Sequence, residues 1–310
     1  MSNNLCVFVN PNAGTGYGLQ WYNIFVEQVN NFECNPVLIT SEKNQIYNFV
    51  KNNTIEILSS FAVVIFGGDG TVYEYLNGFF NSDIKNNNFI HFPPLLVFPT
   101  GSGNSLATNL NLLQLRENNV TSFHSMNVKN IPIWTITHDN NSIFSILSQT
   151  YGIIADIDLS TEWLRKIGDK RYVLGTIWSI LFPKYYKIDC EIIRQNDQKI
   201  YIKGEILLFC ASTVPFITEK MVITSMAKID EELIDIIYVQ DRLSLFQRIK
   251  LVQDLFGGNF SHNKWIKYYK AKSYHLKTDA QNKFMVDGEV IEASEVKVSL
   301  SKHYLPCYSK

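Results

Sequence analysis

The chain has 310 residues, of which 46% are hydrophobic and 18% are charged, and its formal net charge is −1. This length fits one large domain or two ordinary ones, and the near-neutral charge argues against a nucleic-acid binder that works through bulk positive charge. The five cysteines are scattered, with no CxxC or Cys/His cluster, which indicates neither a disulfide framework nor a zinc site and favours a reducing, intracellular compartment.

The first residues, MSNNLCVFVN, predict a strand rather than a signal peptide, because they lack a basic segment and the apolar run stops after five residues. No stretch approaches 18 apolar residues, so the sequence predicts no transmembrane segment. We therefore expect a cytoplasmic protein.

One local plan occurs three times in residues 1–126: an apolar strand, a glycine-rich loop and a helix. The three strand-and-loop segments are LCVFVN with PNAGTGYG (5–18), FAVVIF with GGDGT (61–71) and LLVFP with TGSGN (95–104). A fourth strand, NPVLIT (35–40), precedes a helical pattern that runs to Asn53. Continuous apolar strands that alternate with helices predict a doubly wound, mostly parallel α/β domain, which binds ligands beyond the carboxyl ends of its strands.

The pattern changes after the polar segment RENNVTSFHSMN (116–127), which is typical of a linker. Residues 127–310 predict a mostly antiparallel β domain with helical insertions at Ser160–Trp178 and Ser244–Leu255. The expected strands are IPIWTITH (131–138), IFSILSQTYG (143–152), KIDCEIIRQ (187–195), KGEILLFCAS (203–212), ELIDIIYVQ (232–240), KAKSYHLKT (270–278), KFMVDGEVI (283–291) and VKVSLS (296–301). The sequence thus predicts two domains, 1–126 and 127–310.

The glycine loops predict an anion site, because bare N–H groups and the following helix N-terminus attract phosphate. Three such loops at one sheet edge favour a nucleotide over a set of tight turns. Asp69 lies inside the GGDGT loop. Two interpretations of this acid remain open: it caps a helix, or it accepts a proton from an incoming hydroxyl beside the phosphates.

The motifs also resemble those of a known family. GGDGT followed by E-x-x-N-G, with NPxxGxG upstream and P-x-GSGN downstream, is similar to the diacylglycerol kinase and sphingosine kinase superfamily. The segment 144–176, with ADIDL at 155–159, the GSGNSLA form at 101–107 and VDGE at 286–289 resemble sphingosine kinases in particular. The resemblance implies ATP- and Mg²⁺-dependent phosphorylation of the primary hydroxyl of sphingosine or a related sphingoid base, giving the 1-phosphate.

The resemblance also implies roles for individual residues. Asp69 matches the general base, Asp158 the carboxylate that receives the sphingoid head group, and Ser148 a hydroxyl in the same pocket. Asp287 is in addition a tentative Mg²⁺ ligand. The implied nucleotide-binding positions are Asn10, Pro11, Asn12, Thr40, Ser41, Glu42, Lys43, Asn44, Gly67, Gly68, Gly70, Thr71, Glu74, Gly101, Ser102, Gly103, Arg165, Arg171, Asp287, Gly288 and Glu289.

The residue chemistry agrees with an amine-bearing substrate, since a fixed carboxylate provides a charge-assisted hydrogen bond to an ammonium. Asp156 and Asp158 lie two apart on a strand-like segment, which predicts that both face one side; a polar loop or a helix cap is the alternative interpretation. Apolar residues at 172–183, with Leu251, Leu255 and Phe256, are material for a lipid-tail pocket or equally for a core.

We also expect transient association with a membrane surface, with helices around 160–180 and 244–256 as candidates for a membrane-facing lid. The alternatives are a diacylglycerol or ceramide kinase, an NAD kinase, which shares GGDGT, and a lipid-binding protein without turnover. The sequence predicts no oligomeric state.

Overall fold

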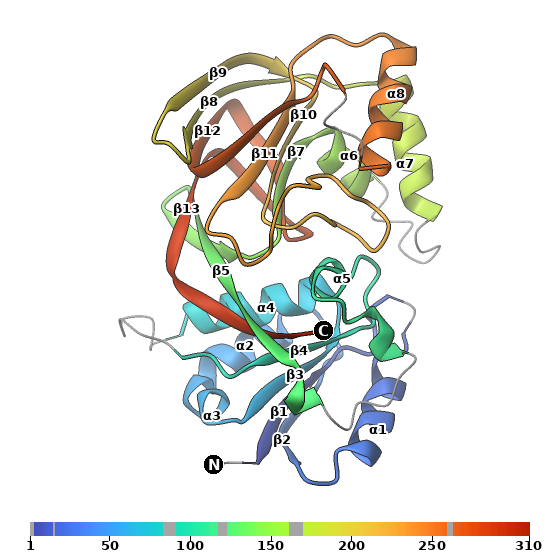
Figure 1. The fold of residues 1–310 in the computed structure, drawn as a ribbon, viewed down its shortest axis with the longest axis vertical. Helices are drawn as coiled ribbons and strands as arrows, with labels where there is room; N and C mark the ends of the chain where they lie inside the picture. The colour runs from blue at the N-terminus through green and yellow to red at the C-terminus, as the bar shows by residue number, and fades with distance from the viewer. Residues whose placement is uncertain (1–2, 15, 83–90, 117–122, 161–169, 259–262) are drawn as a thin grey trace. The chain divides into compact units, whose positions relative to one another are not determined.

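The computed structural model describes residues 3–14, 16–82, 91–116, 123–160, 170–258 and 263–310, with only the backbone described for residues 124, 158–160, 170–173 and 256. The chain forms two compact units: Met1–Ile133 together with Ser301–Lys310, and Trp134–Leu300. It passes from the first unit to the second within strand β5 (Asn127–His138) and returns within β13 (Glu289–Ser309) (Figure 1).

The first unit contains the predicted parallel sheet. Strand β1 (Asn4–Val9) lies between β2 (Glu33–Ile39) and β3 (Ala62–Gly67), and β4 (Leu95–Pro99) pairs with β3, all in parallel. The strand order is β13-β4-β3-β1-β2, so the connections leave β1 in opposite directions. This reversal between β1 and β3 is the topological switch point at which doubly wound sheets bind ligands.

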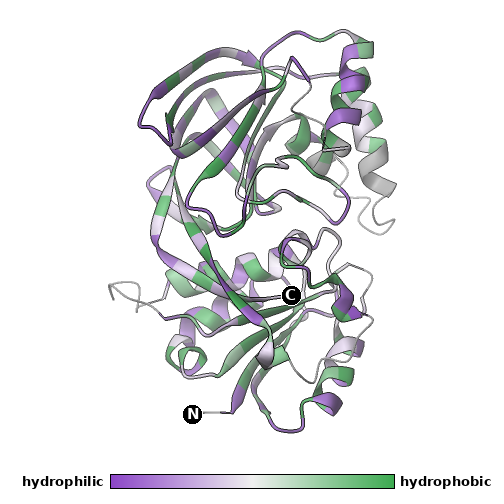
Figure 2. Cartoon of the chain, viewed as in Figure 1, coloured by the Kyte–Doolittle hydropathy of each residue, from purple (hydrophilic) through white to green (hydrophobic). Residues whose placement is uncertain are grey.

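Helices cover both faces of this sheet, as the uniformly apolar strands predict (Figure 2). Phe25 of helix α1 packs edge-on against Phe66 of β3, with ring centroids 5.5 Å apart. Tyr75 of α4 packs on Phe8 of β1, at 6.0 Å. Phe8 pairs with Ile65, the neighbour of Phe66, and adjacent residues of a strand point to opposite faces of the sheet. Phe8 and Phe66, and therefore α4 and α1, lie on opposite faces. The helices of this unit are α1 (Gly18–Gln28), α2 (Gln45–Asn52), α3 (Thr54–Leu58), α4 (Asp69–Phe80) and α5 (Ser105–Asn109), with 3-10 turns η2 (Leu113–Arg116) and η3 (Phe123–Ser125).

The second unit is antiparallel, as predicted. Its long central strand β12 (Lys267–Val286) pairs with β7, β8, β11 and β13. The remaining strands are β6 (Asn141–Ser145), β7 (Ser148–Gly152), β8 (Tyr186–Arg194), β9 (Lys199–Ile206), β10 (Leu208–Ser212) and β11 (Ile234–Val239), and the helices are α6 (Ile153–Ser160), α7 (Lys170–Leu181) and α8 (Leu245–Phe256).

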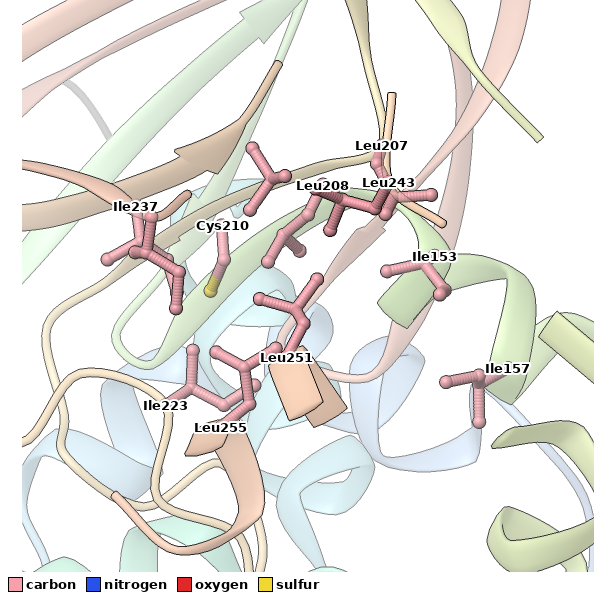
Figure 3. Packing of buried hydrophobic residues seen from close by; sticks show 12 residues of the cluster. Ile153, Ile157, Leu207, Leu208, Cys210, Ile223, Ile237, Leu243, Leu251 and Leu255 are labelled. Carbon is pink, nitrogen blue, oxygen red and sulfur yellow. The ribbon is translucent and has the colours of Figure 1, made fainter. Parts of the chain in front are cut away.

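Helix α8 confirms the predicted insertion and begins with a capping box. The Ser244 hydroxyl accepts from the Gln247 N–H at 3.5 Å, and the Gln247 side chain accepts from the Ser244 N–H at 2.7 Å. Leu251 and Leu255 face inward and join a buried cluster with residues of α6, β10 and β11 (Figure 3). In the described part of the chain, no helix combines the length and apolarity needed to cross a bilayer.

Four expected elements differ in the structure. The ADIDL block is helical, within α6, rather than strand-like, so Asp156 and Asp158 lie about 200° apart around the helix axis and do not share a side. The segments 143–152 and 203–212 each form two strands. KFMVDGEVI is not one strand, because Asp287 (φ 50°) and Gly288 (φ 86°) make the left-handed turn between β12 and β13.

The units also differ from the predicted domains. The boundary lies seven residues later than 126, inside β5, and residues 301–310 belong to the first unit rather than to the second. Their strand pairs with β4 at Cys307 and Leu95, and Leu305 and Cys307 are fully buried. The C-terminal segment is therefore part of the core of the parallel sheet unit.

Candidate active site

The loops that follow β1, β2, β3 and β4 all leave the same edge of the parallel sheet, since parallel strands share the position of their carboxyl ends. These loops carry the sequence-predicted nucleotide positions of the first unit, at residues 10–12, 40–44, 67–71 and 101–103, while Glu74 lies one turn into α4. The structure thus brings this part of the predicted set to one edge.

The glycine loops touch one another through their backbones. A Cβ atom on Gly14 would lie 2.4 Å from the Thr100 carbonyl oxygen, and one on Gly101 would lie 2.4 Å from the Gly68 Cα. Any larger residue at these positions would force the loops apart. The N–H-rich segments of three loops are therefore concentrated in one small region at the switch point.

Asp69 lies at the centre of this region, as the first residue of α4. Its Oδ2 accepts from the Ser105 N–H at 2.9 Å and its Oδ1 from the Leu106 N–H at 3.0 Å, both at the start of α5. A Cβ on Gly103 would lie 3.2 Å from Oδ2, so the GSGN loop lies directly against the carboxylate. The acid is held in a fixed orientation beside the loops.

Glu74, on the same helix, acts in a similar way on a second loop. Its Oε1 accepts from the Asn44 N–H at 2.9 Å and its Oε2 from the Tyr47 N–H at 3.4 Å, so it binds the first turn of α2. Asn44 has a left-handed conformation, φ 66°, at the end of the 40–44 turn. The carboxylate therefore stabilises a turn that is a predicted nucleotide-binding segment.

Asn10, Asn12 and Thr71 link the loops further. The Asn10 amide donates to the Thr71 hydroxyl at 3.2 Å and accepts from the Asn12 N–H at 3.0 Å, and the Asn12 amide donates to the Ser41 carbonyl at 3.4 Å. Asn104, which the sequence reasoning did not include, bonds Gly101 twice, at 2.8 Å to its N–H and 2.7 Å to its carbonyl. Asn104 is the last residue of the TGSGN motif, so its place in that motif is the sequence signal that could have identified it.

The second unit places Asp287 in a buried turn. Its Oδ1 accepts from the Ser145 hydroxyl at 2.7 Å and from the Leu147 and Ser148 N–H groups at 3.1 and 2.9 Å, and its Oδ2 accepts from the Ile146 N–H at 2.8 Å. Burial raises the pKa of the Asp287 carboxyl to about 6, although these hydrogen bonds act in the opposite direction.

Three of these donors reach Oδ1 and one reaches Oδ2, so the carboxylate already accepts four hydrogen bonds from the protein. The assignment of Mg²⁺ to Asp287 stays a prediction. Among the described residues, no group of three or more His, Cys, Asp and Glu side chains is arranged to hold a metal ion. Asp287 joins the β12–β13 turn to the β6–β7 connection and to the predicted Ser148, the first residue of β7; Gly288 completes the turn and Glu289 begins β13.

The ADIDL block supplies a half-buried acid, Asp156, that the sequence analysis did not assign to the substrate. The Tyr186 hydroxyl donates to Asp156 Oδ1 at 2.7 Å and lies 2.9 Å from Oδ2. Burial raises the pKa of the Asp156 carboxyl, while the Tyr186 hydrogen bond and the charge of Lys184 lower it. Asp158 belongs to the same helix, α6, and Arg171 belongs to α7, but only the backbone of these two residues is described. Arg165 lies outside the described residues.

Comparisons with known proteins show which enzymes the chain resembles. Residues 4–136 match the diacylglycerol kinase catalytic domain. The chain is 24% identical over 336 residues to sphingoid long chain base kinase 4 of Schizosaccharomyces pombe, an alignment that covers 93% of this chain and 71% of the relative. It is 31% identical over 202 residues to sphingosine kinase 1 of Caenorhabditis elegans, which covers 59% of this chain and 41% of that protein.

The fold agrees with these matches. The solved structure of a diacylglycerol kinase from Bacillus anthracis str. Sterne has a TM-score of 0.73 at 20% identity, and the alignment covers 99% of this chain and 97% of that one. The domain matched by residues 4–136 is that of lipid kinases. The chain is similar to members of the diacylglycerol kinase and sphingosine kinase superfamily.

Proposed function

We propose that the protein is an ATP-dependent kinase that phosphorylates the primary hydroxyl of a sphingoid base. The observation that carries this proposal is the position of Asp69, which is fixed by two backbone N–H groups among three touching glycine loops. An anchored carboxylate beside a phosphate-binding edge is the arrangement that phosphoryl transfer to an alcohol requires.

In the proposed reaction, the backbone N–H groups of the loops after β1, β3 and β4 hold the nucleotide phosphates at the switch point. Asp69 accepts the proton of the lipid hydroxyl while the hydroxyl oxygen forms a bond to the terminal phosphorus of ATP. The bond between that phosphorus and the bridging oxygen breaks, and ADP leaves. The resemblance implies that Mg²⁺ accompanies the nucleotide, where it would neutralise charge on the phosphates.

The substrate class rests on α6. The segment that resembles sphingosine kinases contains both Asp156 and Asp158, and the resemblance assigns the ammonium of the head group to Asp158. A carboxylate there would favour an amine-bearing lipid over a neutral one by about 1.5–3 kcal/mol. The names of the two curated relatives, a sphingoid base kinase and a sphingosine kinase, support the same substrate class.

The structure bears on the proposed tail pocket. Leu251 and Leu255, which the sequence offered either as tail-pocket material or as core, are 0% and 5% exposed within the packed cluster of Figure 3. They are core residues in this conformation. A lipid tail at this position would have to displace α8 from its contacts with α6, β10 and β11.

Membrane association is supported by an exposed apolar stripe. Along α7 and the residue after it, successive exposed side chains are three or one residues apart, which places them on one helical face. They are Leu174, Ile177, Trp178, Leu181 and Phe182, each between 50% and 61% exposed. This stripe overlaps the predicted membrane-facing region around 160–180, in which the structure describes the side chains from Leu174 onward.

Turnover with radiolabelled ATP tests the proposal. The panel of acceptors is sphingosine, dihydrosphingosine, phytosphingosine, diacylglycerol, ceramide and NAD, with Asp69→Asn and Asp158→Ala beside the parent. We expect phosphate transfer to the three amine-bearing lipids, its loss in Asp69→Asn, and a selective loss for these lipids in Asp158→Ala. Faster transfer to diacylglycerol or ceramide, with Asp158→Ala unaffected, would replace the sphingoid base as substrate.

A further inference from the structure

Helix α5, which holds the Asp69 carboxylate, is itself very short. It contains five residues, Ser105–Asn109, and an isolated helix of this length is unstable in water. The N–H groups of Ser105 and Leu106 are the donors to the two oxygens of Asp69. The contacts that hold α5 in place therefore also fix the two donors that orient this carboxylate.

The far end of α5 is held by Lys310, the residue that follows β13. The Lys310 N–H donates to the carbonyl of Leu110, the C-cap residue of α5, at 3.1 Å. In return, the side-chain amide of Asn111 donates to the Lys310 carbonyl at 3.4 Å. Asn111 has a left-handed conformation, φ 58°, at the point where the chain leaves the helix. The end of α5 thus exchanges two hydrogen bonds with one residue of a distant segment.

The segment that leads to Lys310 is firmly anchored in the core of the first unit. Cys307 pairs with Leu95 of β4, and Tyr308 and Ser309 are 3% and 1% exposed. The Tyr308 ring packs edge-on against Phe123, with centroids 5.6 Å apart. Strand β4 is also the strand that leads into the GSGN loop. The end of β13 is therefore a rigid support on which a five-residue helix can be held.

We propose that residues 308–310 position the Asp69 carboxylate through α5, with Asn111 as the positioning residue that links the two. The inference rests on the proposed function, which gives Asp69 its catalytic role, but not on the proposed substrate. It adds to the candidate active site a contact between residues 199 apart in the sequence, outside every glycine motif.

The coupling follows from the length of α5. Five residues span about 7.5 Å along a helix axis, so a shift at the Leu110 end reaches the Ser105 and Leu106 N–H groups within little more than one turn. A general base has to lie within hydrogen-bond reach of the hydroxyl that it deprotonates. A small change in the orientation of Asp69 therefore slows the chemical step. It affects ATP binding less, because the nucleotide is held by several loops and only the GSGN loop adjoins α5.

The test combines amide hydrogen exchange of residues 105–110 with turnover. Lys310→Pro removes the N–H that bonds Leu110, and Lys310→Ala, which keeps this N–H, is its matched control. Asn111→Gly removes the side-chain donor, and glycine accepts the left-handed conformation. Its control is Asn140→Gly, at an exposed left-handed Asn of the β5–β6 turn. Exchange is measured without nucleotide or lipid, so failure of the proposed function, seen as no turnover by the parent, does not affect this measurement.

We expect the amides of residues 105–110 to exchange about tenfold faster in Lys310→Pro and in Asn111→Gly than in their controls, with exchange in β1 and β3 unchanged. With the best acceptor of the panel above, kcat should fall by about three- to tenfold at a constant KM for ATP. In the Asp69→Asn background neither change should lower the residual rate further, because both act through that carboxylate. Exchange equal to that of the controls, faster exchange at an unchanged kcat, or the same fractional loss in the Asp69→Asn background would each overturn the proposal.

Discussion

The Asp69 carboxylate binds the Ser105 N–H at 2.9 Å, so an acid in the GGDGT loop fixes the start of the helix that follows the GSGN loop. The two loops come from neighbouring parallel strands, β3 and β4, and the hydrogen bond holds them in register. The question of whether Asp69 is a structural cap or a catalytic acid thus has a two-part answer: it caps α5, and this bond fixes the carboxylate where the proposed reaction needs it.

Asp69→Asn tests both parts. The amide retains one acceptor oxygen, so one of the two N–H groups of α5 loses its partner, and we expect a loss of about 1–3 kcal/mol in the free energy of unfolding. Turnover should fall by about 10²–10⁴, because an amide cannot accept the proton. The measurements are the melting temperature and the rate of phosphate transfer. Glu27→Gln, at an exposed acid of α1, is the control, and turnover of Asp69→Asn within about tenfold of that control would remove Asp69 from the reaction.

Glu74→Ala should separate loop positioning from chemistry. The change removes the acceptor for the Asn44 and Tyr47 N–H groups, which is equivalent to the loss of a helix cap worth about 0.5–2 kcal/mol. If the 40–44 turn binds the nucleotide, the KM for ATP rises several-fold while kcat changes little. Steady-state kinetics over a range of ATP concentrations provide the measurement. An unchanged KM, equal to that of Glu27→Ala, would show that the turn does not contact ATP.

The glycine loops and their common edge could be predicted, because each loop has a local sequence pattern, an apolar strand followed by glycine, and a parallel sheet brings the carboxyl ends of its strands together. The hydrogen-bond partners of the acids could not be predicted in this way. Asp69 binds Ser105 at a separation of 36 residues, and Asp287 binds Ser145 at 142. Nothing in GGDGT or VDGE specifies donors so far away, so the sequence could not predict these hydrogen bonds.

The helical ADIDL block was missed for a different reason. The run Ile153, Ile154, Ala155 and Ile157 is apolar on nearly all sides, and an apolar run of this length has no period that separates a strand from a buried helix. The consequence reaches the site, since Asp156 and Asp158 then lie on different sides of α6. Asp156 is directed to Tyr186 of β8, a residue without any motif in the sequence.

Asp287 should give the protein a measurable pH dependence. Its folded-state pKa, about 6, lies above the ordinary value of 3.8. Between these values the folded state binds more protons than the unfolded state, so this contribution to stability is complete below about pH 4 and is lost as the pH rises through 6. Asn is accepted in the left-handed turn and does not titrate. The melting temperature of the parent minus that of Asp287→Asn should therefore decrease from pH 4 to pH 6.5 and stay constant above pH 6.5. A constant difference throughout would show that Asp287 has an ordinary pKa.

Tyr186→Phe should test whether Asp156 positions α6. The variant removes the donor from a carboxylate that is already disfavoured by burial, so the pKa of Asp156 rises further and the native state loses about 1–3 kcal/mol at neutral pH. Because α6 also carries Asp158, we expect the KM for sphingosine to rise while the KM for ATP stays constant.

The matched control for this change is Tyr201→Phe, whose side chain is 66% exposed and bonds Glu191 on the surface. A merely structural role for Tyr186 would lower the melting temperature and leave both KM values unchanged below it. A positioning role predicts instead that the sphingosine KM alone changes, and that Asp158→Ala combined with Tyr186→Phe raises it no further than Asp158→Ala by itself, since the two changes would act through the same contact.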